Sequence, residues 1–144
     1  MQEKHITVQK ILVFIFGLPI LLVVLFIGYE IVGMAVNHAA GDKQTKKLTA
    51  YAEEQGFEIV ATDTFVGNSG NGNHVDLISK IYVKSESSSE ELSSRLGSYD
   101  GGDIRVCEPN EDELTKAGIT AQEDGIYMLR LFNSAPFVDN IEGH

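Results

Sequence analysis

The sequence has one cysteine, no tryptophan and few basic residues. A single cysteine, Cys107, cannot form an intramolecular disulfide, so any folded part must be held together by its own apolar core. Lysine and arginine total 11 against 21 aspartate and glutamate residues, which gives a net charge of −10. Because phosphate binding requires cationic side chains that displace counterions, this balance argues against a nucleic-acid interface, and we expect no nucleic-acid partner.

The usual motifs of metal and nucleotide chemistry are also missing. The chain has no CxxC, HxxxH or HExxH pattern, and residues 67–72 lack the Gly-Lys-Ser/Thr ending of a phosphate-binding loop. Cys107 lies in a strand-like run, where a lone cysteine is typically a small buried hydrophobe. The histidines are scattered along the chain: His5, His38, His74 and His144. We therefore expect no catalytic, cofactor-binding or metal-binding residues, and no enzyme activity.

The segment from Gly67 to His74 is the first part of the chain for which a binding or catalytic role stays open as an alternative. It places oxygen-bearing side chains between glycines, as calcium loops do, but lacks the spacing and the terminal glutamate of an EF-hand loop. We interpret it as a flexible hairpin loop. The oxygen-bearing residues in and around it are Asp63, Asn68, Asn71, Asn73 and Asp76. His74 could also form a hydrolase dyad with Cys107 if folding brings the two together.

Paired carboxylates are the second alternative, because glycoside hydrolysis uses two of them across a cleft. The pair Asp100 and Asp103 and the group Glu111, Asp112 and Glu113 are the candidates. They fall in a turn and in the first turn of an expected helix, where acidic side chains cap the backbone and complement the helix dipole. Local capping is the interpretation that we favour for both.

A long apolar run dominates the N-terminal part of the chain. The nineteen residues from Ile11 to Tyr29 include no charged residue, and as a helix they would cover about 28 Å, close to the thickness of the bilayer hydrocarbon. Lys10 and Glu30 mark its two ends, and Tyr29 suits a membrane interface. The pattern predicts a transmembrane helix within residues 11–36, with the lipid bilayer as the partner of residues 11–29.

A cleaved signal peptide is the main alternative to this anchor. Its apolar region should be about 7–15 residues long and be followed closely by a small-x-small cleavage site. The run is longer than that, and the small-x-small segment 33–35 lies beyond Glu30. We expect an uncleaved signal-anchor. Lys4 and Lys10 favour a cytoplasmic N-terminus, so that the chain would be anchored in the cell membrane with its C-terminal part outside the cytoplasm. Lys43 and the lysines that follow it nearly balance the number of positive charges on the other side of the run.

The remaining chain predicts a small acidic α+β domain. Asp42 can cap a helix over residues 43–55, and Gly56 can end it. Residues 57–66 and 75–84 have the composition and alternation of a β-hairpin. Ser88 and Glu91 have capping-box spacing, which predicts a helix that Gly97 closes. Further segments complete the pattern: a strand over 104–108, a helix over 109–117 and a strand over 126–132.

This order predicts one transmembrane helix followed by a mostly antiparallel four-stranded sheet with two or three helices on one face. The domain boundaries follow: a tail over 1–10, the anchor over 11–36, a polar connector over 37–47, the α+β domain over 48–132 and an irregular tail over 133–144. In that tail, Phe137, Val138 and Ile141 are the residues that could pack back onto the domain.

The anchor, the small domain and the missing catalytic motifs favour a single-pass membrane protein whose extracytoplasmic domain is a binding or accessory module. It would act by contact with a protein partner in the membrane or envelope. Two alternatives stay open: an accessory subunit that faces the cytoplasm, and an envelope enzyme with an unrecognised site. The sequence does not identify the partner or the ligand, nor a role for Cys107 or for the loop from Gly67 to His74.

Overall fold

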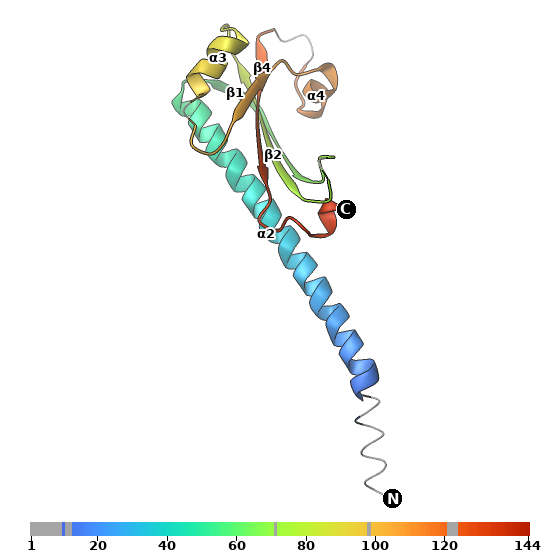
Figure 1. Cartoon of the computed structure of the whole chain (residues 1–144). Coiled ribbons are helices and arrows are strands. Elements are labelled where there is room, and N and C mark those ends of the chain that lie inside the picture. Colours follow the sequence, from blue (N-terminus) through green and yellow to red (C-terminus); the bar gives the residue numbers. More distant parts are fainter. Residues whose placement is uncertain (1–9, 11–12, 71, 98, 121–123) are drawn as a thin grey trace, which may run out of the picture.

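One continuous helix, α2 (Leu18–Glu54), runs the length of the molecule. In this computed structural model, which describes residues 10, 13–70, 72–97, 99–120 and 124–144, α2 follows a π-helical turn, η1 (Val13–Gly17). Pro19 lies at the start of α2, where its missing N–H costs nothing because the first turn has no intrahelical acceptor for it. Thirty-seven residues extend about 55 Å. The N-terminal half of α2 projects alone, and the C-terminal half carries a sheet (Figure 1).

The continuity of α2 corrects the prediction of a connector over 37–47 and of a separate helix capped by Asp42. The buried residues of α2 explain why the helix does not break at Gly41. They form a stripe that faces the sheet: Asn37, Gly41, Thr45, Leu48 and Ala52. Packing of this stripe outweighs the local stop signals, since tertiary contacts override intrinsic helix propensity. Residues 1–9 of the expected N-terminal tail, the first two residues of the predicted span, and Asn71 lie outside the described residues.

The other elements confirm the predicted fold class. The strands β1 (Glu58–Gly67), β2 (Asp76–Lys84), β3 (Ile104–Cys107) and β4 (Ile126–Ser134) form one sheet in the order β1-β2-β4-β3. Each neighbouring pair is antiparallel, and β1 and β2 form the expected hairpin. Three short helices are α3 (Ser89–Leu96), α4 (Glu111–Lys116) and the 3-10 turn η2 (Ile141–Gly143). Ser88 caps α3 and Asn110 caps α4.

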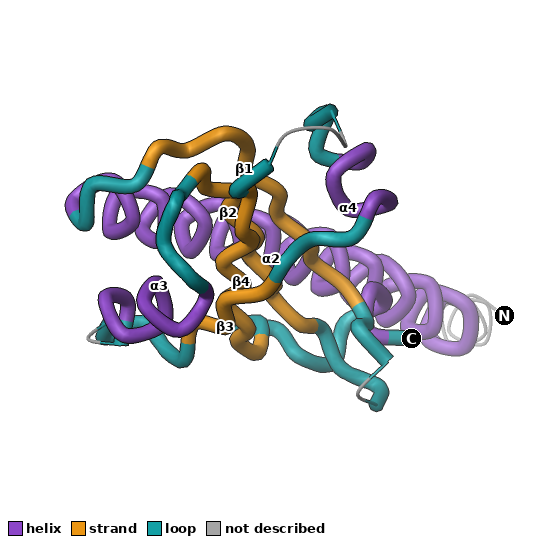
Figure 2. Tube along the Cα trace, turned by 90° about the horizontal axis from the view of Figure 1, so that it is seen from above, coloured by secondary structure: helices purple, strands orange, loops and turns teal. Residues whose placement is uncertain are grey.

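The sheet has a helix-packed core on each face. On one face, Leu48 and Ala52 of α2 and Leu92 and Leu96 of α3 pack against the inner side chains of β2 and β4, which are Ile81, Val83, Leu129 and Leu131. On the other face, Leu114 of α4 packs with Tyr82 and Met128. Figure 2 shows α3 and α4 on opposite sides of the strands, which corrects the prediction that the helices share one face: α2 and α3 do, and α4 lies on the other. Since α4 covers only one end of its face, the rest of that face stays open.

A polar layer separates two apolar parts of the contact between α2 and the sheet. Thr45 Oγ1 lies 2.6 Å from Thr64 Oγ1 and donates to Ser79 Oγ at 2.8 Å. Gln44 Nε2 donates to the same Ser79 oxygen at 3.1 Å, and Asn133 Nδ2 donates to Gln44 Oε1 at 2.9 Å. Because unsatisfied buried polar groups are costly, this network selects one register of the helix on the sheet.

The C-terminal segment is more ordered than the predicted irregular tail. Strand β4 continues to Ser134, and η2 follows near the C-terminus. The Phe137 ring meets the edge of the Tyr29 ring, with centroids 5.7 Å apart, and Val138 O accepts from Val75 N at 2.8 Å. Ile141, which we expected to pack back, leaves 61% of its surface exposed, and it is held through its backbone: its N–H donates to Glu30 and its C=O accepts from His144 N.

Candidate functional site

The loop between β1 and β2 holds the C-terminal segment. Asn68 uses both its backbone N–H and its side-chain Nδ2 as donors, to Glu142 O at 3.1 Å and to Gly143 O at 2.8 Å. Ser69 donates through its N–H and its hydroxyl to Asp76 Oδ2. Asn68 Oδ1 in turn accepts from Gly70 N at 2.7 Å, so two of the candidate calcium-binding oxygens, Asn68 Oδ1 and Asp76 Oδ2, are already used within the protein. Among the residues that the structure describes, no three His, Cys, Asp or Glu side chains gather as a metal site would require.

Helix α2 holds the same segment from its other side. Asn37, which is fully buried, donates to Phe137 O and accepts from Phe137 N, both at 2.9 Å. Glu30 accepts from Ile141 N at 2.8 Å, and His38 Nε2 lies 2.7 Å from Glu142 Oε1. We call residues 135–143, with these contacts to α2 and to the β1–β2 loop, the C-terminal clasp.

The clasp fixes the domain to the end of the apolar run. Without it, the sheet would contact α2 only from about Gly41 onward, and the stretch of helix between the apolar run and the sheet would be free to bend. Glu30, Asn37 and His38 all bind the C-terminal segment, and these contacts restrict bending between the helix and the sheet. We call these contacts between α2 and the clasp the rigid mount, because they fix the distance and the orientation of the domain's surface relative to the apolar helix.

Ser69, Asp76 and His74 contact one another in that order, which is not the order that nucleophilic catalysis requires. The fully buried Asp76 stands between the other two: its Oδ2 accepts from the Ser69 hydroxyl, and its Oδ1 lies 3.0 Å from His74 Nε2. In a hydrolase triad, histidine lies between the hydroxyl and the carboxylate so that it can take the proton. Here Asp76 accepts from the hydroxyl itself, which suits a loop clamp.

The alternative of a dyad of His74 and Cys107 fails, because folding does not bring the two residues together. Cys107 lies opposite Met128 on β4, whereas Asp76, two residues after His74, lies opposite Ser134. Six strand residues separate these two levels of the sheet, or about 20 Å. Of the carboxylate candidates, the group in α4 is placed as capping predicted: Glu113 completes the capping box, and Glu111 and Asp112 occupy the first turn. Asp103 precedes β3 and lines the hollow described below.

Cys107 is half-buried under α4, and this environment suppresses its ionisation. Burial raises the pKa of the thiol above its ordinary value of 9.0, and the nearby Glu113 carboxylate raises it further, against opposing effects of Arg130 and Lys80. Burial, with Glu113 and Asp63, likewise raises the pKa of Tyr82 beside it. Both groups favour the neutral form when folded. Their contribution to stability is therefore present below the ordinary pKa values and is lost as the pH rises through the raised ones.

We predict that iodoacetamide alkylates Cys107 slowly in the folded protein at pH 8, several-fold more slowly than in protein unfolded in urea. The thiolate is the reacting species, so its rate should rise with a midpoint above pH 9.0. Mass spectrometry over a pH series, with the unfolded chain as the control, measures both midpoints. A folded midpoint at or below that of the unfolded chain would contradict this assignment.

The open part of the α4 face carries a cationic row and an apolar row. Strand register places Lys80 opposite Arg130, and Arg130 opposite Arg105. The next outward-facing row is Phe65, Ile78 and Phe132, and the two phenylalanines each leave 40% of their surface exposed. Lys80 is neutralised by Glu113 at 3.4 Å. Within the described part of the chain, no carboxylate pairs with Arg105 or Arg130.

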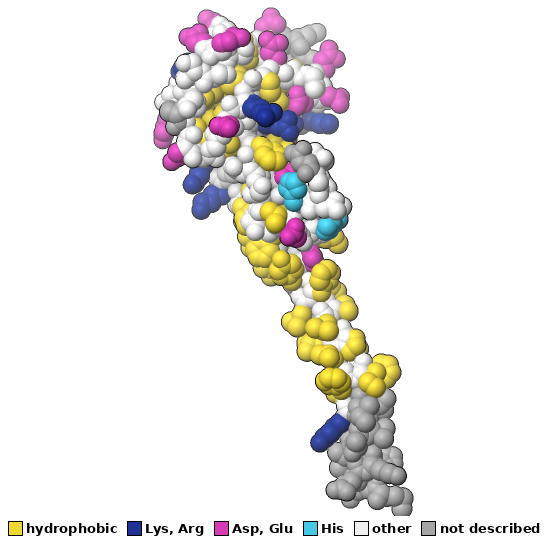
Figure 3. All heavy atoms as spheres, in the orientation of Figure 1, with side chains coloured by type: hydrophobic (Ala, Val, Ile, Leu, Met, Phe, Trp, Pro, Cys, Tyr) yellow, Lys and Arg dark blue, Asp and Glu magenta, His cyan; other side chains and the backbone are white. Residues whose placement is uncertain are grey.

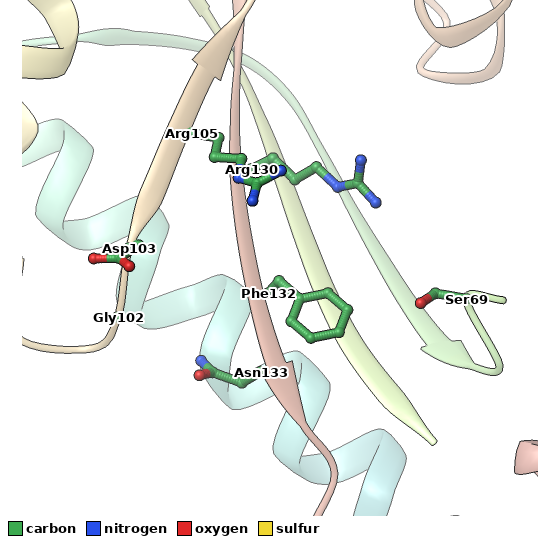
Figure 4. Close-up of a pocket in the computed structure, with 7 residues that line it drawn as sticks. All are labelled: Ser69, Gly102, Asp103, Arg105, Arg130, Phe132 and Asn133. Atoms are coloured by element: carbon green, nitrogen blue, oxygen red, sulfur yellow. The ribbon is translucent and has the colours of Figure 1, made fainter. Parts of the chain in front are cut away.

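A hollow of about 660 Å³ opens beside these two arginines, and we call it the arginine hollow. Figure 4 shows Arg130 and the ring of Phe132 extending toward Ser69, with Asp103 at the other end of the view. Its remaining lining comes from Gly102, Arg105 and Asn133. Figure 3 shows dark-blue side chains in the middle of the domain's visible face, while magenta acidic side chains gather at the end far from the apolar half of α2.

Sequence reasoning did not identify these arginines. Each occupies an outward position of a short strand, which is ordinary for a charged residue. Only the insertion of β4 between β2 and β3 makes them neighbours. No protein family, curated protein or solved structure matches the chain.

Proposed function

We propose that the chain is a single-pass membrane protein whose small domain is a binding or accessory module outside the cytoplasm, acting by contact with a protein partner. Among the residues that the structure describes, one helix is long and apolar enough to cross a membrane. Its apolar side chains from Val13 to Tyr29 stand bare, mostly at 50% exposure or more. Bare apolar surface of this extent needs a lipid or protein environment.

The C-terminal clasp is the observation that best supports the proposal, because residues at the C-terminal end of the predicted membrane span take part in it. Tyr29, Glu30 and Gly33 all meet the C-terminal segment. Cleavage after Ala35, the small-x-small alternative, would remove these three residues and would leave Ile141 N without its acceptor. Retention of the helix as an anchor keeps them. These contacts therefore favour an uncleaved signal-anchor over a removable leader.

The rigid mount determines how far from the end of the apolar run the domain can contact a partner. Gln44, which bonds to Asn133 of β4, lies fourteen residues beyond Glu30, or about 21 Å along the helix. Arg130 is three strand residues further from the clasp, about 10 Å more. Arg130 thus stands roughly 30 Å from the end of the apolar run, beyond the lipid head groups, while the Ser69 side of the arginine hollow lies nearer the clasp. In this proposal the domain is not an enzyme, and the clamp around Asp76 serves structure.

Topology is the decisive test of this proposal. An epitope placed after His144 should be removed by protease from intact cells stripped of any wall, and the purified protein should keep its N-terminal residues by mass spectrometry. Permeabilised cells provide the positive control for digestion. Loss of the epitope only after permeabilisation would support the cytoplasm-facing alternative. A mature chain that begins after Ala35 would overturn the anchor.

A further inference from the structure

We propose that the arginine hollow and the neighbouring surface of α2 form one site for an extended acidic segment of the partner protein. This inference rests on the proposed function, since it names the chemistry of the partner. The pair Arg105 and Arg130 lies at one end of this site, and a second cationic pair, Lys43 and Lys47, lies at the other end. The inference is independent of which protein supplies the segment.

The stability of the domain does not explain why Arg105 and Arg130 lie opposite each other. Like charges directly opposite each other on neighbouring strands destabilise a sheet, and Arg105 and Arg130 are such a pair. The third cation of the row, Lys80, has Asp63 opposite it and Glu113 at 3.4 Å, so the sheet neutralises that position. It leaves Arg105 and Arg130 without a carboxylate in the described chain. A protein with a net charge of −10 that keeps two adjacent cations unpaired presents them to an anion from outside.

A second hollow continues the first around the edge of β4. It encloses about 230 Å³ and is lined by Lys43 and Lys47 of α2, together with Gln44 and Tyr99. Asn133 lines both hollows, and Gly101 of the second adjoins Gly102 of the first. Cations therefore stand at both ends of one continuous surface. A ligand that reaches both must be elongated and must carry more than one negative charge.

The strand edge between the hollows favours a peptide over other anions. The ladder of β3 with β4 ends at Leu131, while β4 continues to Ser134. An extended peptide can add to such an edge through backbone hydrogen bonds. The fork of an arginine guanidinium matches a carboxylate in two parallel hydrogen bonds, and Phe132 and Tyr99 supply the aromatic contacts common at protein interfaces. Lipid head groups of the anchoring membrane are too far away to reach this surface.

Asp103 limits which acidic segments fit. Its carboxylate lines the arginine hollow between the two cationic pairs and would repel an acid directly beside it. A segment in which acidic and neutral residues alternate places a carboxylate about every 7 Å on one face. Such spacing lets the acids meet the arginines and the lysines, while the gap between two successive carboxylates leaves room for Asp103. The favoured ligand is therefore an alternating acidic segment rather than an unbroken acidic run.

The test uses the full chain in lipid nanodiscs and a fluorescein-labelled peptide of five Glu-Thr repeats. Fluorescence anisotropy should show saturable binding that weakens with added NaCl, and the matching Gln-Thr peptide should bind at least tenfold more weakly. R105Q/R130Q should lose at least tenfold in affinity and K43Q/K47Q about threefold. The control K46Q/K116Q makes the same change in charge at exposed lysines outside both hollows and should bind as the wild type does.

Several results would overturn the site. These are equal binding of the two peptides, equal losses in the control and in R105Q/R130Q, or tighter binding of polyphosphate than of the acidic peptide, which would make the ligand an anionic polymer. Cross-linking in intact cells separates this failure from failure of the proposed function. A partner captured equally by wild type and R105Q/R130Q refutes the site and keeps the function. No partner captured by the wild type, beside positive peptide binding, refutes the function and keeps the site.

Discussion

The substitution Gly41→Leu is expected to detach the sheet from α2 and to lower the stability of the domain by about 3 kcal/mol. At Gly41 even a Cβ atom would lie 2.8 Å from Val66 Cγ2 and 3.0 Å from Thr64 Cγ2. A leucine adds three more carbons at the same point, so β1 must move away. That movement would also break the contact of Thr64 with Thr45 in the polar layer. Thermal unfolding in detergent, followed by circular dichroism, should show a midpoint about 10 °C lower.

Gly28→Leu provides the matched control. Gly28 lies in the same helix, and nothing stands within 4 Å of the position that its Cβ would take. Leucine there adds apolar surface to a stretch that already faces outward, so the unfolding midpoint should stay within about 2 °C of wild type, as expected for a substitution away from packed features. A melting curve of Gly41→Leu equal to that of Gly28→Leu would show that α2 does not pack against β1 at this point.

Gly41 also shows why the continuous helix was not predictable. Glycine followed by an aspartate and lysines is typical of a helix end followed by a new start. The buried position of Gly41 is instead where β1 approaches α2 most closely, and only glycine leaves that room. Local signals at Gly41 and Asp42 thus indicated a boundary. The contact that overrides them depends on residues more than twenty positions further along the chain.

The strands and the short helices were predictable because their signals are local. The alternation in β2 and the Ser88 cap of α3 each report their structure within a few residues. The clasp and the arginine hollow depend instead on distant pairs. Asn37 meets Phe137, and Arg105 meets Arg130, only after the strand order is set. Polar residues at such positions look like ordinary connector or surface residues until the fold is known.

The substitution Asn37→Ala is expected to release the C-terminal clasp and to cost about 3 kcal/mol. The side chain of Asn37 is fully buried and makes two hydrogen bonds, with the N–H and the C=O of Phe137. Alanine would leave both backbone groups without partners in a site closed to water, at about 1–3 kcal/mol each when nothing replaces the bond. The unfolding midpoint should fall by about 10 °C in detergent. An epitope after His144 should also be cleaved faster by protease, since the segment that bears it is no longer held.

Asn73→Ala is the control for the loss of an asparagine, because Asn73 is exposed in the β1–β2 loop. It should leave both the melting midpoint and the cleavage rate unchanged. Asn37→Asp separates hydrogen bonding from packing: the carboxylate can still accept from Phe137 N but can no longer donate to Phe137 O. We therefore expect Asn37→Asp to be destabilised as Asn37→Ala is, although its volume is nearly native. If Asn37→Asp were as stable as wild type, the amide would not be the clasp's anchor, and the rigid mount would have to rest on Glu30 and the Tyr29–Phe137 contact instead.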